Sequence, residues 1–400
     1  MLAVYLSPLY AAWNILQLIW ILRWMQNCSG FFRSNGARTV VVLIYAFFAV
    51  SMLIAFFLPP SQLQRWMKVI GNYWLGTLLY MTLTIGAALV IRFLMLILPL
   101  KNKGFLFSRR GFAVSGAVCL LIIVGLSIWG IINARTIRIT RYTASVNKEC
   151  SLSQATGGTL RIALIADLHL GYNISNGSMR KMVEKLNEEA PDLVVIAGDI
   201  FDNEYEALED PEELAQILSG IRSKYGVFAC YGNHDIQEPI LAGFTFGSKT
   251  KKMSDPRMDE LLEKAGIRLL RDEAVLIEDA FYVYGRPDYE RPGRGIDQRK
   301  TPEEITAGLD QTKPIIVIDH QPRELKELAD AGVDIDLCGH THDGQMFPAN
   351  LLVSMMWENS CGMLKKGNMT NIVTSGLGVF GPFMRVGTKS EICMIDVNFR

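Results

Sequence analysis

Residues able to bind metal ions follow five short apolar stretches in the second half of the sequence. They are Asp167 and His169, Asp199 and Asp202, Asn233, His234 and Asp235, then His320, and last His340 and His342. All five histidines of the chain lie in these motifs. Histidines used as ordinary core or surface residues would be scattered, so this concentration indicates one shared site.

The number and type of these groups suit two metal ions better than one. A single tetrahedral ion takes four ligands, whereas two five- or six-coordinate ions that share a carboxylate use more. Imidazole, carboxylate and amide ligands without thiolate point to Mn²⁺, Fe or Zn²⁺ and do not distinguish among the three. Two such ions lower the pKa of bound water and hold the attacking and leaving oxygens of an in-line displacement. The predicted chemistry is hydrolysis of a phosphate ester or pyrophosphate by a metal-bridging hydroxide.

Alternating apolar and amphipathic stretches from residue 159 onward predict the elements that position these groups. Strands are expected at 160–165, 193–197, 226–231, 281–284, 315–318, 335–338, 371–374 and 391–397, with helices at 178–189, 211–224 and 322–331. Short apolar runs of this kind are typical of strands buried on both faces of an α/β sandwich. Ligands in α/β sheets collect at the carboxyl ends of strands. Glycines at 198, 232 and 339 would allow close approach of the backbone there.

The first part of the chain has a different composition. No Asp or Glu precedes Glu149, so residues 1–148 carry a formal charge of +14 and the remainder −14. Apolar stretches at 1–22, 39–59, 73–91 and 111–133 are each long enough to cross a bilayer. We therefore expect a transmembrane region with four spans at 1–133, a linker at 134–158 and a catalytic domain at 159–400.

Basic residues near the spans bear on orientation. Seven lie in the two loops facing one side and five on the side of the termini, which favours an outward-facing catalytic domain on an integral protein of the plasma membrane. Arg92 is the only charge within a span and no inverted repeat is apparent, so the spans are interpreted as an anchor to the bilayer and not as a transporter. The negative second half disfavours nucleic acid as a partner.

The order of the five motifs resembles the calcineurin-like metallophosphoesterase superfamily, in its membrane-anchored bacterial branch, over residues 160–397. The resemblance implies a transmembrane helical region followed by a β-sandwich flanked by helices, with two divalent metal ions. It assigns Asp167, His169 and His342 to the first ion, Asp199 to both, and Asn233, His320 and His340 to the second. It also makes His234 the general acid, with Asp235 orienting its ring.

The substrate and several nearby residues remain open at this stage. A phospholipid or lipid-linked nucleotide sugar, as in a UDP-diacylglucosamine pyrophosphatase, competes with a soluble nucleotide or phosphodiester and with a non-catalytic metal-binding membrane sensor. Arg286 and Arg385 are either a clamp for the substrate phosphate or surface residues, and Asp202 is expected to support a ligand. The apolar segment 346–357 is expected in the core, with acyl-chain binding as the alternative. Residues 243–252 either contact anionic headgroups through Phe244, Phe246 and their lysines or form a solvated loop. The oligomeric state is open.

Overall fold

The computed structural model describes residues 2–59, 61–98, 104–151, 158–236, 240–241, 244–245, 253–293 and 298–400. The chain divides into two compact units, one made of the N-terminal helices up to Ile132 and the other of most residues from Asn133 onward. The expected headgroup contact at 243–252 rests on side chains that lie outside the described residues.

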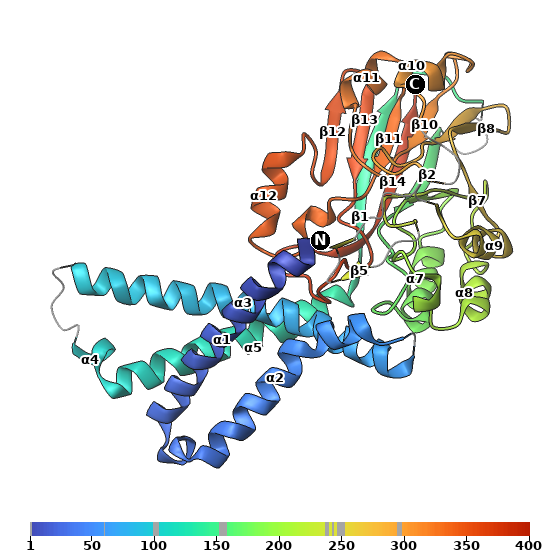
Figure 1. Cartoon of the computed structure of the whole chain (residues 1–400). Coiled ribbons are helices and arrows are strands. Elements are labelled where there is room, and N and C mark those ends of the chain that lie inside the picture. Colours follow the sequence, from blue (N-terminus) through green and yellow to red (C-terminus); the bar gives the residue numbers. More distant parts are fainter. Residues whose placement is uncertain are drawn as a thin grey trace. The chain divides into compact units, whose positions relative to one another are not determined.

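Long helices make up the first unit, in blue to cyan in Figure 1. They are α1 (Leu2–Cys28), α2 (Asn35–Phe57), α3 (Gln62–Ile97) and α5 (Arg109–Ala134), with the short elements η1 (Gly30–Arg33) and α4 (Gly104–Phe107) between them. Serine caps begin two of the helices, since the side chains of Ser34 and Ser61 accept hydrogen bonds from the amides of Ala37 and Gln64.

Among the described residues, three of these helices are long and apolar enough to cross a membrane: α2, α3 and α5. The expected count of four spans is not confirmed, because the stretch 1–22 lies within α1, a 27-residue helix outside this set of three. The expected span 73–91 is part of α3, which has 36 residues. A helix of that length measures about 54 Å, more than the hydrocarbon core requires.

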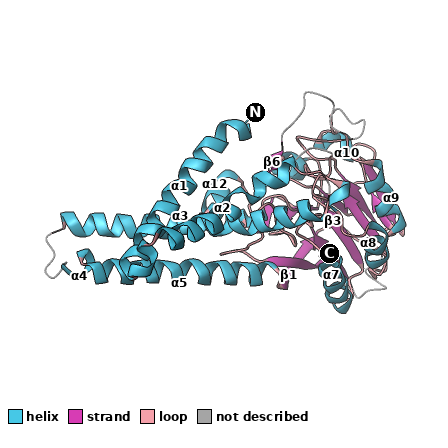
Figure 2. Ribbon diagram, turned by 60° about the horizontal axis from the view of Figure 1, so that its bottom comes forward, coloured by secondary structure: helices cyan, strands magenta, loops and turns pink. Residues whose placement is uncertain are grey.

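Two six-stranded sheets form the second unit, shown as magenta arrows in Figure 2. The first has the order β1 (Ile137–Val146), β14 (Ser390–Phe399), β2 (Thr159–Ile165), β3 (Leu193–Ala197), β4 (Val227–Cys230), β7 (Ile267–Leu269). The second has the order β12 (Gly362–Lys366), β13 (Met369–Val373), β11 (Ile335–Cys338), β10 (Ile315–Ile318), β9 (Phe281–Gly285), β8 (Glu273–Ile277). A separate pair, β5 (Ile240–Leu241) and β6 (Phe244–Thr245), is antiparallel.

Apolar side chains from both sheets share one core. Leu164 and Val195 of the first sheet belong to the same buried cluster as Ile316 and Leu337 of the second. Strands β2, β3, β4 and β7 run parallel to one another, as do β9, β10, β11 and β13. The mixed α/β architecture predicted from the short apolar runs is confirmed.

The expected linker at 134–158 contains a strand of the sandwich. β1 pairs in parallel with β14 along its whole length, from Ile137 opposite Ser390 to Val146 opposite Phe399. Its buried and exposed positions alternate over part of its length, and its arginines and threonines made it resemble a linker in composition. Charged side chains of this kind are common on edge strands, where they discourage pairing with other chains.

Helices flank the two sheets (Figure 1). They are α7 (Asn176–Glu188), α8 (Pro211–Leu218), α9 (Pro256–Lys264), α10 (Pro302–Thr306), α11 (Leu325–Asp330) and α12 (Ala349–Met356), with η2 (Tyr205–Ala207) and η3 (His342–Gly344) as short turns. α8 ends at Leu218, six residues before the expected end at 224. Leu325 and Leu328 of α11 pack in a buried cluster with Ile315 and Val317 of β10.

The apolar segment 346–357 is not the core segment that we expected. It forms α12, and Leu352, Met355 and Met356 expose 63%, 84% and 76% of their surface. The sequence shows only that these residues are apolar, which fits a buried helix and an exposed one equally well.

Candidate metal centre

The sheet topology brings the predicted ligands to one edge of the sandwich. Asp167, Asp199 and Asn233 each follow one of the adjacent parallel strands β2, β3 and β4. His320 and His340 follow β10 and β11, which are adjacent and parallel in the second sheet. The carboxyl ends of these strands in both sheets therefore bring polar side chains to one edge of the sandwich. The residues that carry these side chains are spread over more than 170 positions of the sequence.

A first group consists of Asp167, His169 and His342. One ligand atom from each lies within 4.8 Å of the others, and all three residues are buried. The Nε2 atoms of His169 and His342 are 3.1 Å apart, and His342 Nε2 is 3.6 Å from an oxygen of Asp167. These are the three residues assigned to the first ion by the sequence.

A second group consists of Asp199, His320 and His340, again within 4.8 Å of one another. His320 Nε2 lies 3.1 Å from Asp199 Oδ2 and 3.2 Å from His340 Nδ1. The side-chain oxygen of Asn233 is 3.1 Å from the same Nε2 atom. The amide, the carboxylate and both imidazoles thus converge as the second predicted set.

Asp199 faces both groups. Its Oδ2 atom is 3.1 Å from His320 Nε2 in the second group and 3.8 Å from His169 Nε2 in the first. A carboxylate in this position is able to bridge two ions. The nitrogen and oxygen donors fit Mn²⁺, Fe or Zn²⁺, and they do not select one of these metals.

The backbone of the site is strained at five of the seven predicted ligands. Asp167, His169, Asp199, His340 and His342 have φ values of 53°, 46°, 49°, 73° and 50°. A left-handed conformation at a residue other than glycine costs about 1–3 kcal/mol and is typical of functional sites. Ladder-like hydrogen bonds hold two of these residues, from the Asp167 amide to the Gly198 carbonyl and from the His169 amide to the Asp199 carbonyl, each 3.0 Å long.

Two glycines allow the loops of the two sheets to approach each other. Gly198 has a φ of 78°, and a Cβ atom there would lie 2.5 Å from His320 Nδ1. A Cβ atom on Gly339 would lie 2.5 Å from the Cβ atom of Ala166. Neither distance is tolerated between real atoms, so the predicted close approach of the backbone is confirmed at both positions.

A hydrogen bond orients the ring of His320, and a carboxylate faces the ring of His169, each on the side of the ring away from the ligand groups. His320 Nδ1 is 2.9 Å from the carbonyl oxygen of Ala197, so this nitrogen donates and Nε2 presents its lone pair to the second group. His169 Nδ1 lies 3.5 Å from an oxygen of Asp202, while its Nε2 faces the first group. Asp202 therefore contacts the predicted ligand His169 on the side of the ring away from the first group, which agrees with the supporting role expected for Asp202.

The orienting role expected for Asp235 is corrected by the structure. The two oxygens of Asp235 accept hydrogen bonds from the backbone amides of Phe201 and Gly232, each 2.7 Å long. His234 Nδ1 is instead 2.7 Å from the side-chain oxygen of Asn203. The tight turn at 232–235 directs the Asp235 side chain back toward the end of β3, away from the neighbouring ring. Asn203 carries no sequence signal beyond its place next to Asp202.

Two aromatic side chains lie beside the ligand groups: Phe380, which escaped the sequence analysis, and Trp357, which ends the apolar segment 346–357. The ring of Phe380 lies 5.3 Å from that of His234 and 6.0 Å from that of His169. Gln345 fixes the backbone of Phe380, since its side chain accepts from the Phe380 amide at 2.8 Å and donates to the Phe380 carbonyl at 2.9 Å. The ring of Trp357 lies 5.2 Å from that of His340. Aromatic walls therefore stand beside both ligand groups.

Neither interpretation of Arg286 and Arg385 is correct, because both side chains are completely buried. Arg286 forms ion pairs of 2.8 Å with Asp319 and with Glu324. Arg385 donates to the carbonyl oxygens of Ser375 and Gly378, each at 2.7 Å. The two guanidinium groups thus brace the loops around the site and are not free to clamp a phosphate.

The electrostatics of the site favour binding of positive charge. Burial, together with the charge of His320, lowers the pKa of His340 to about 3, and burial also lowers the pKa of His234 to about 4. Burial by itself would also lower the pKa of His320. The negative charge of the facing Asp199 carboxylate has the larger effect, so the pKa of His320 is raised well above its usual value. Neutral imidazoles and ionised carboxylates are the forms that bind metal ions. A divalent ion would take the place of the proton that Asp199 draws to His320.

Comparisons with known proteins agree with this geometry. The sequence profile of the calcineurin-like phosphoesterase family matches residues 160–344. A transmembrane protein with a metallophosphoesterase domain from Danio rerio is 29% identical over 383 residues, which cover 90% of this chain and 79% of that protein. A metallophosphoesterase of Aquifex aeolicus is 28% identical, with 65% of this chain and 92% of that protein covered.

A more distant relative has a named activity. The UDP-2,3-diacylglucosamine pyrophosphatase LpxG of Chlamydia trachomatis is 24% identical over 220 residues, which cover 47% of this chain and 64% of that enzyme. The matched profile includes all the predicted ligands, and the structure gathers them into two adjoining groups. Residues 160–344 form a calcineurin-like phosphoesterase domain, and the protein is a metal-dependent hydrolase.

Proposed function

We propose that the protein is a membrane-anchored phosphoesterase with a dinuclear metal centre, which hydrolyses a phosphate ester or a pyrophosphate bond. The observation that carries the proposal is the position of Asp199 between the two ligand groups, 3.1 Å from His320 Nε2 and 3.8 Å from His169 Nε2. Asp167, His169 and His342 would hold one ion, and Asn233, His320 and His340 the other. Mn²⁺, Fe and Zn²⁺ all fit this donor set.

Such ions, when bound, lower the pKa of water and polarise the phosphate oxygens. The chain itself supplies the proton for the leaving group. His234 Nδ1 is held by Asn203, which leaves Nε2 available to a leaving oxygen, and the His234 ring lies 5.1 Å from that of His169 in the first group. A phosphate anion beside the ring would favour its protonated form. These contacts support His234 as the general acid.

A groove beside the metal centre supports an amphipathic substrate. It has a volume of about 340 Å³ and is lined in part by Tyr289, Arg323, Met356 and Trp357. The guanidinium of Arg323 lies 4.9 Å from the ring of Trp357 and 4.9 Å from that of Tyr289. Trp357 in turn touches the His340 ring, so the groove adjoins the second ligand group.

We propose that an anionic headgroup lies near Arg323 and that an apolar chain lies along the exposed face of α12. Met355 and Met356 on this helix expose 84% and 76% of their surface, which a soluble nucleotide would leave uncovered. A phospholipid or lipid-linked nucleotide sugar has both parts. The name of the chlamydial relative, a pyrophosphatase for a diacylated nucleotide sugar, points to the same substrate class.

The test is a substrate screen with the full-length protein in detergent, depleted of metal and reloaded with Mn²⁺, Fe²⁺ or Zn²⁺. Substrates are aryl phosphate mono- and diesters, nucleotides, phospholipids, and a nucleotide sugar with and without acyl chains. We expect hydrolysis that depends on metal and is about 10²-fold or more lower in His234→Ala at unchanged metal content. Bound metal without hydrolysis of any substrate would instead indicate a metal-binding sensor.

A variant of α12 tests the apolar part of the substrate. Met355→Ser is expected to raise KM for the diacylated substrate about three- to tenfold, because a methionine contact is lost, and to leave KM for the deacylated form unchanged. The matched control is Met363→Ser on β12, which is also exposed, at 51%. An equal change for both forms of the substrate would contradict contact between the acyl chain and α12.

The charge distribution supports an orientation. With all four expected spans crossing the bilayer, seven basic residues would face one side and five the side of the termini, and on this basis we propose that the catalytic domain lies on the outer face of the plasma membrane. A protease added to intact cells should then digest the catalytic domain, and complete protection in intact cells but not in lysed cells would place it inside.

A further inference from the structure

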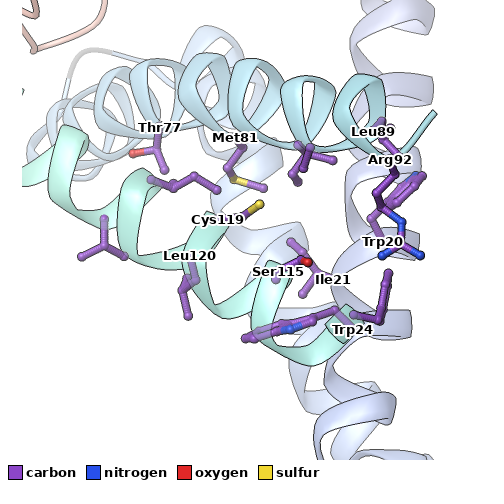
Figure 3. Close-up of a pocket in the computed structure, with 16 residues that line it drawn as sticks. Trp20, Ile21, Trp24, Thr77, Met81, Leu89, Arg92, Ser115, Cys119 and Leu120 are labelled. Carbon is purple, nitrogen blue, oxygen red and sulfur yellow. The ribbon is translucent and has the colours of Figure 1, made fainter. Parts of the chain in front are cut away.

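Helices α1, α3 and α5 enclose an apolar cavity of about 270 Å³ within the helical unit. Figure 3 shows the side chains that line it, which come from all three helices and point toward a shared space. They include Trp20, Trp24, Met81 and Cys119. Leu89 and Leu120 line the cavity and are also partly exposed, so it opens at the outer surface of the helices. Because its lining is almost entirely apolar, the cavity offers few hydrogen-bond partners to water.

A single charged side chain, Arg92, lines one end of the cavity, close to Trp20 in Figure 3. Its Nη1 atom donates to the carbonyl oxygen of Leu106 at 2.9 Å. Its guanidinium also lies 5.2 Å from the ring of Phe107 and 5.4 Å from that of Phe112. A carbonyl oxygen and two aromatic faces attract the guanidinium, but they are neutral groups and do not balance its formal charge.

No counter-ion for Arg92 is available in this part of the sequence, since no Asp or Glu precedes Glu149. A charge within a membrane span is costly and is usually paired. The negative charge that balances Arg92 therefore has to come from a group outside residues 1–148.

The location of Arg92 along its helix suits a lipid headgroup. It lies five residues before the end of α3 at Ile97, which is about 8 Å along the helix axis. A long side chain at that position reaches the interface of the bilayer. Four more basic residues follow in the sequence, Lys101 and Lys103 after α3 and Arg109 and Arg110 at the start of α5, and such clusters attract anionic lipids.

We propose that this cavity binds one anionic phospholipid, with an acyl chain between α1, α3 and α5 and its phosphate at Arg92. The apolar lining matches the chain, and the unbalanced guanidinium matches the phosphate. All lining residues belong to the helical unit, so the lipid site is separate from the metal centre and does not depend on the reaction proposed there. A lipid bound to the folded helices would stabilise them.

Two tryptophans provide a direct measurement, because Trp20 and Trp24 line the cavity. The full-length protein is placed in nanodiscs that contain increasing fractions of phosphatidylglycerol or phosphatidylcholine with the same brominated acyl chain, and quenching of tryptophan fluorescence is recorded at each fraction. We expect a saturable component that is about fivefold stronger for phosphatidylglycerol, as expected for one lipid–arginine interaction near the bilayer surface. It should disappear when Trp20 and Trp24 are both replaced by Phe.

Variants of Arg92 test the charge. Arg92→Gln should abolish the preference for phosphatidylglycerol, whereas Arg92→Lys should retain most of it. Arg33→Gln is the matched control, an exposed basic residue of η1 that belongs neither to the cavity lining nor to this basic cluster, and it should behave as the unmodified protein does. Each variant is checked for folding by gel filtration.

Cys119→Phe tests the cavity itself, because the larger side chain would fill the space between the helices without adding a tryptophan to the fluorescence signal. Saturable quenching by both lipids should be lost in this variant. Equal quenching by the two lipids in the unmodified protein, or an unchanged preference in Arg92→Gln, would overturn the proposal. Preserved quenching in Cys119→Phe would do the same.

Discussion

The imidazole of His234 is held by a residue that no motif contains. Asn203 accepts a hydrogen bond of 2.7 Å from His234 Nδ1, which fixes the ring and its tautomer. Replacing Asn203 by leucine keeps much of the volume and removes the acceptor. We predict that Asn203→Leu lowers kcat about 10- to 100-fold, measured in steady-state kinetics, while the metal content stays unchanged.

Asn203→Asp is the control for this prediction, since a carboxylate oxygen is able to accept the same hydrogen bond and should preserve most of kcat. An Asn203→Leu protein with an unchanged kcat would show that the His234 ring needs no support from Asn203. Loss of metal from Asn203→Leu would instead assign Asn203 to the stability of the site.

At this scale the sequence predicted residue types well and contacts poorly. Asp167, Asp199 and the histidines were identified because metal ligands are few in kind and because they follow strands. Asn203 and Phe380 were missed because the residue that contacts a histidine ring can come from any loop. Neither an asparagine nor a phenylalanine indicates by its residue type that it will make such a contact. The buried ion pairs of Arg286 were missed for the same reason: only the folded chain shows that Asp319 and Glu324 lie beside it.

Strand β11, which leads to His340, contains a buried carboxyl group with incomplete pairing. Asn371 donates to Asp336 Oδ2 at 2.8 Å, and among the described residues Asp336 Oδ1 has no hydrogen-bond partner. Burial, with a smaller contribution from Asp319, raises the pKa of Asp336 to about 7. The folded protein thus binds this proton more tightly than the unfolded chain does, so stability falls as the pH rises from about 3.8 to about 7.

Asp336→Asn cannot ionise and should escape this loss. We predict that the variant is more stable than the unmodified protein above pH 7, by about 1–3 kcal/mol, and that the difference shrinks toward the usual carboxyl pKa of 3.8. The measurement is the midpoint of thermal unfolding in detergent as a function of pH. Asp330→Asn, an exposed carboxylate paired with Lys326, should show no such trend. A difference independent of pH would contradict the account.

Secondary-structure elements differ in how well the sequence predicts them. β3, β10 and β11 have the predicted bounds because runs of four or five apolar residues between polar turns fit a strand buried on both faces. β1 was hidden by its arginines and threonines, because an edge strand is half exposed. α12 was assigned to the core because its residues are apolar. Hydrophobicity alone does not show whether another part of the protein covers a helix.

At the scale of the whole molecule, the composition alone separated two parts with different surroundings. The apolar stretches in a part of the chain without acidic residues predicted apolar helices that the structure contains, although the expected count of four spans is not confirmed. The sandwich was predictable in class because its strands alternate with helices, whereas the pairing of β1 with β14 joins residues about 250 positions apart and needs the folded chain. Convergence of the two sheets at one edge is what creates the metal centre.

The central claim is that residues from both sheets hold two ions around Asp199, and the number of metal ions bound per chain tests it most directly. The full-length protein is saturated with Mn²⁺, freed of excess ion by gel filtration, and analysed by elemental mass spectrometry. We predict two ions per chain, and about one in each of His342→Ala and His320→Ala, because each variant disrupts a different ligand group. A single ion in the unmodified protein, or two ions in both variants, would contradict the claim.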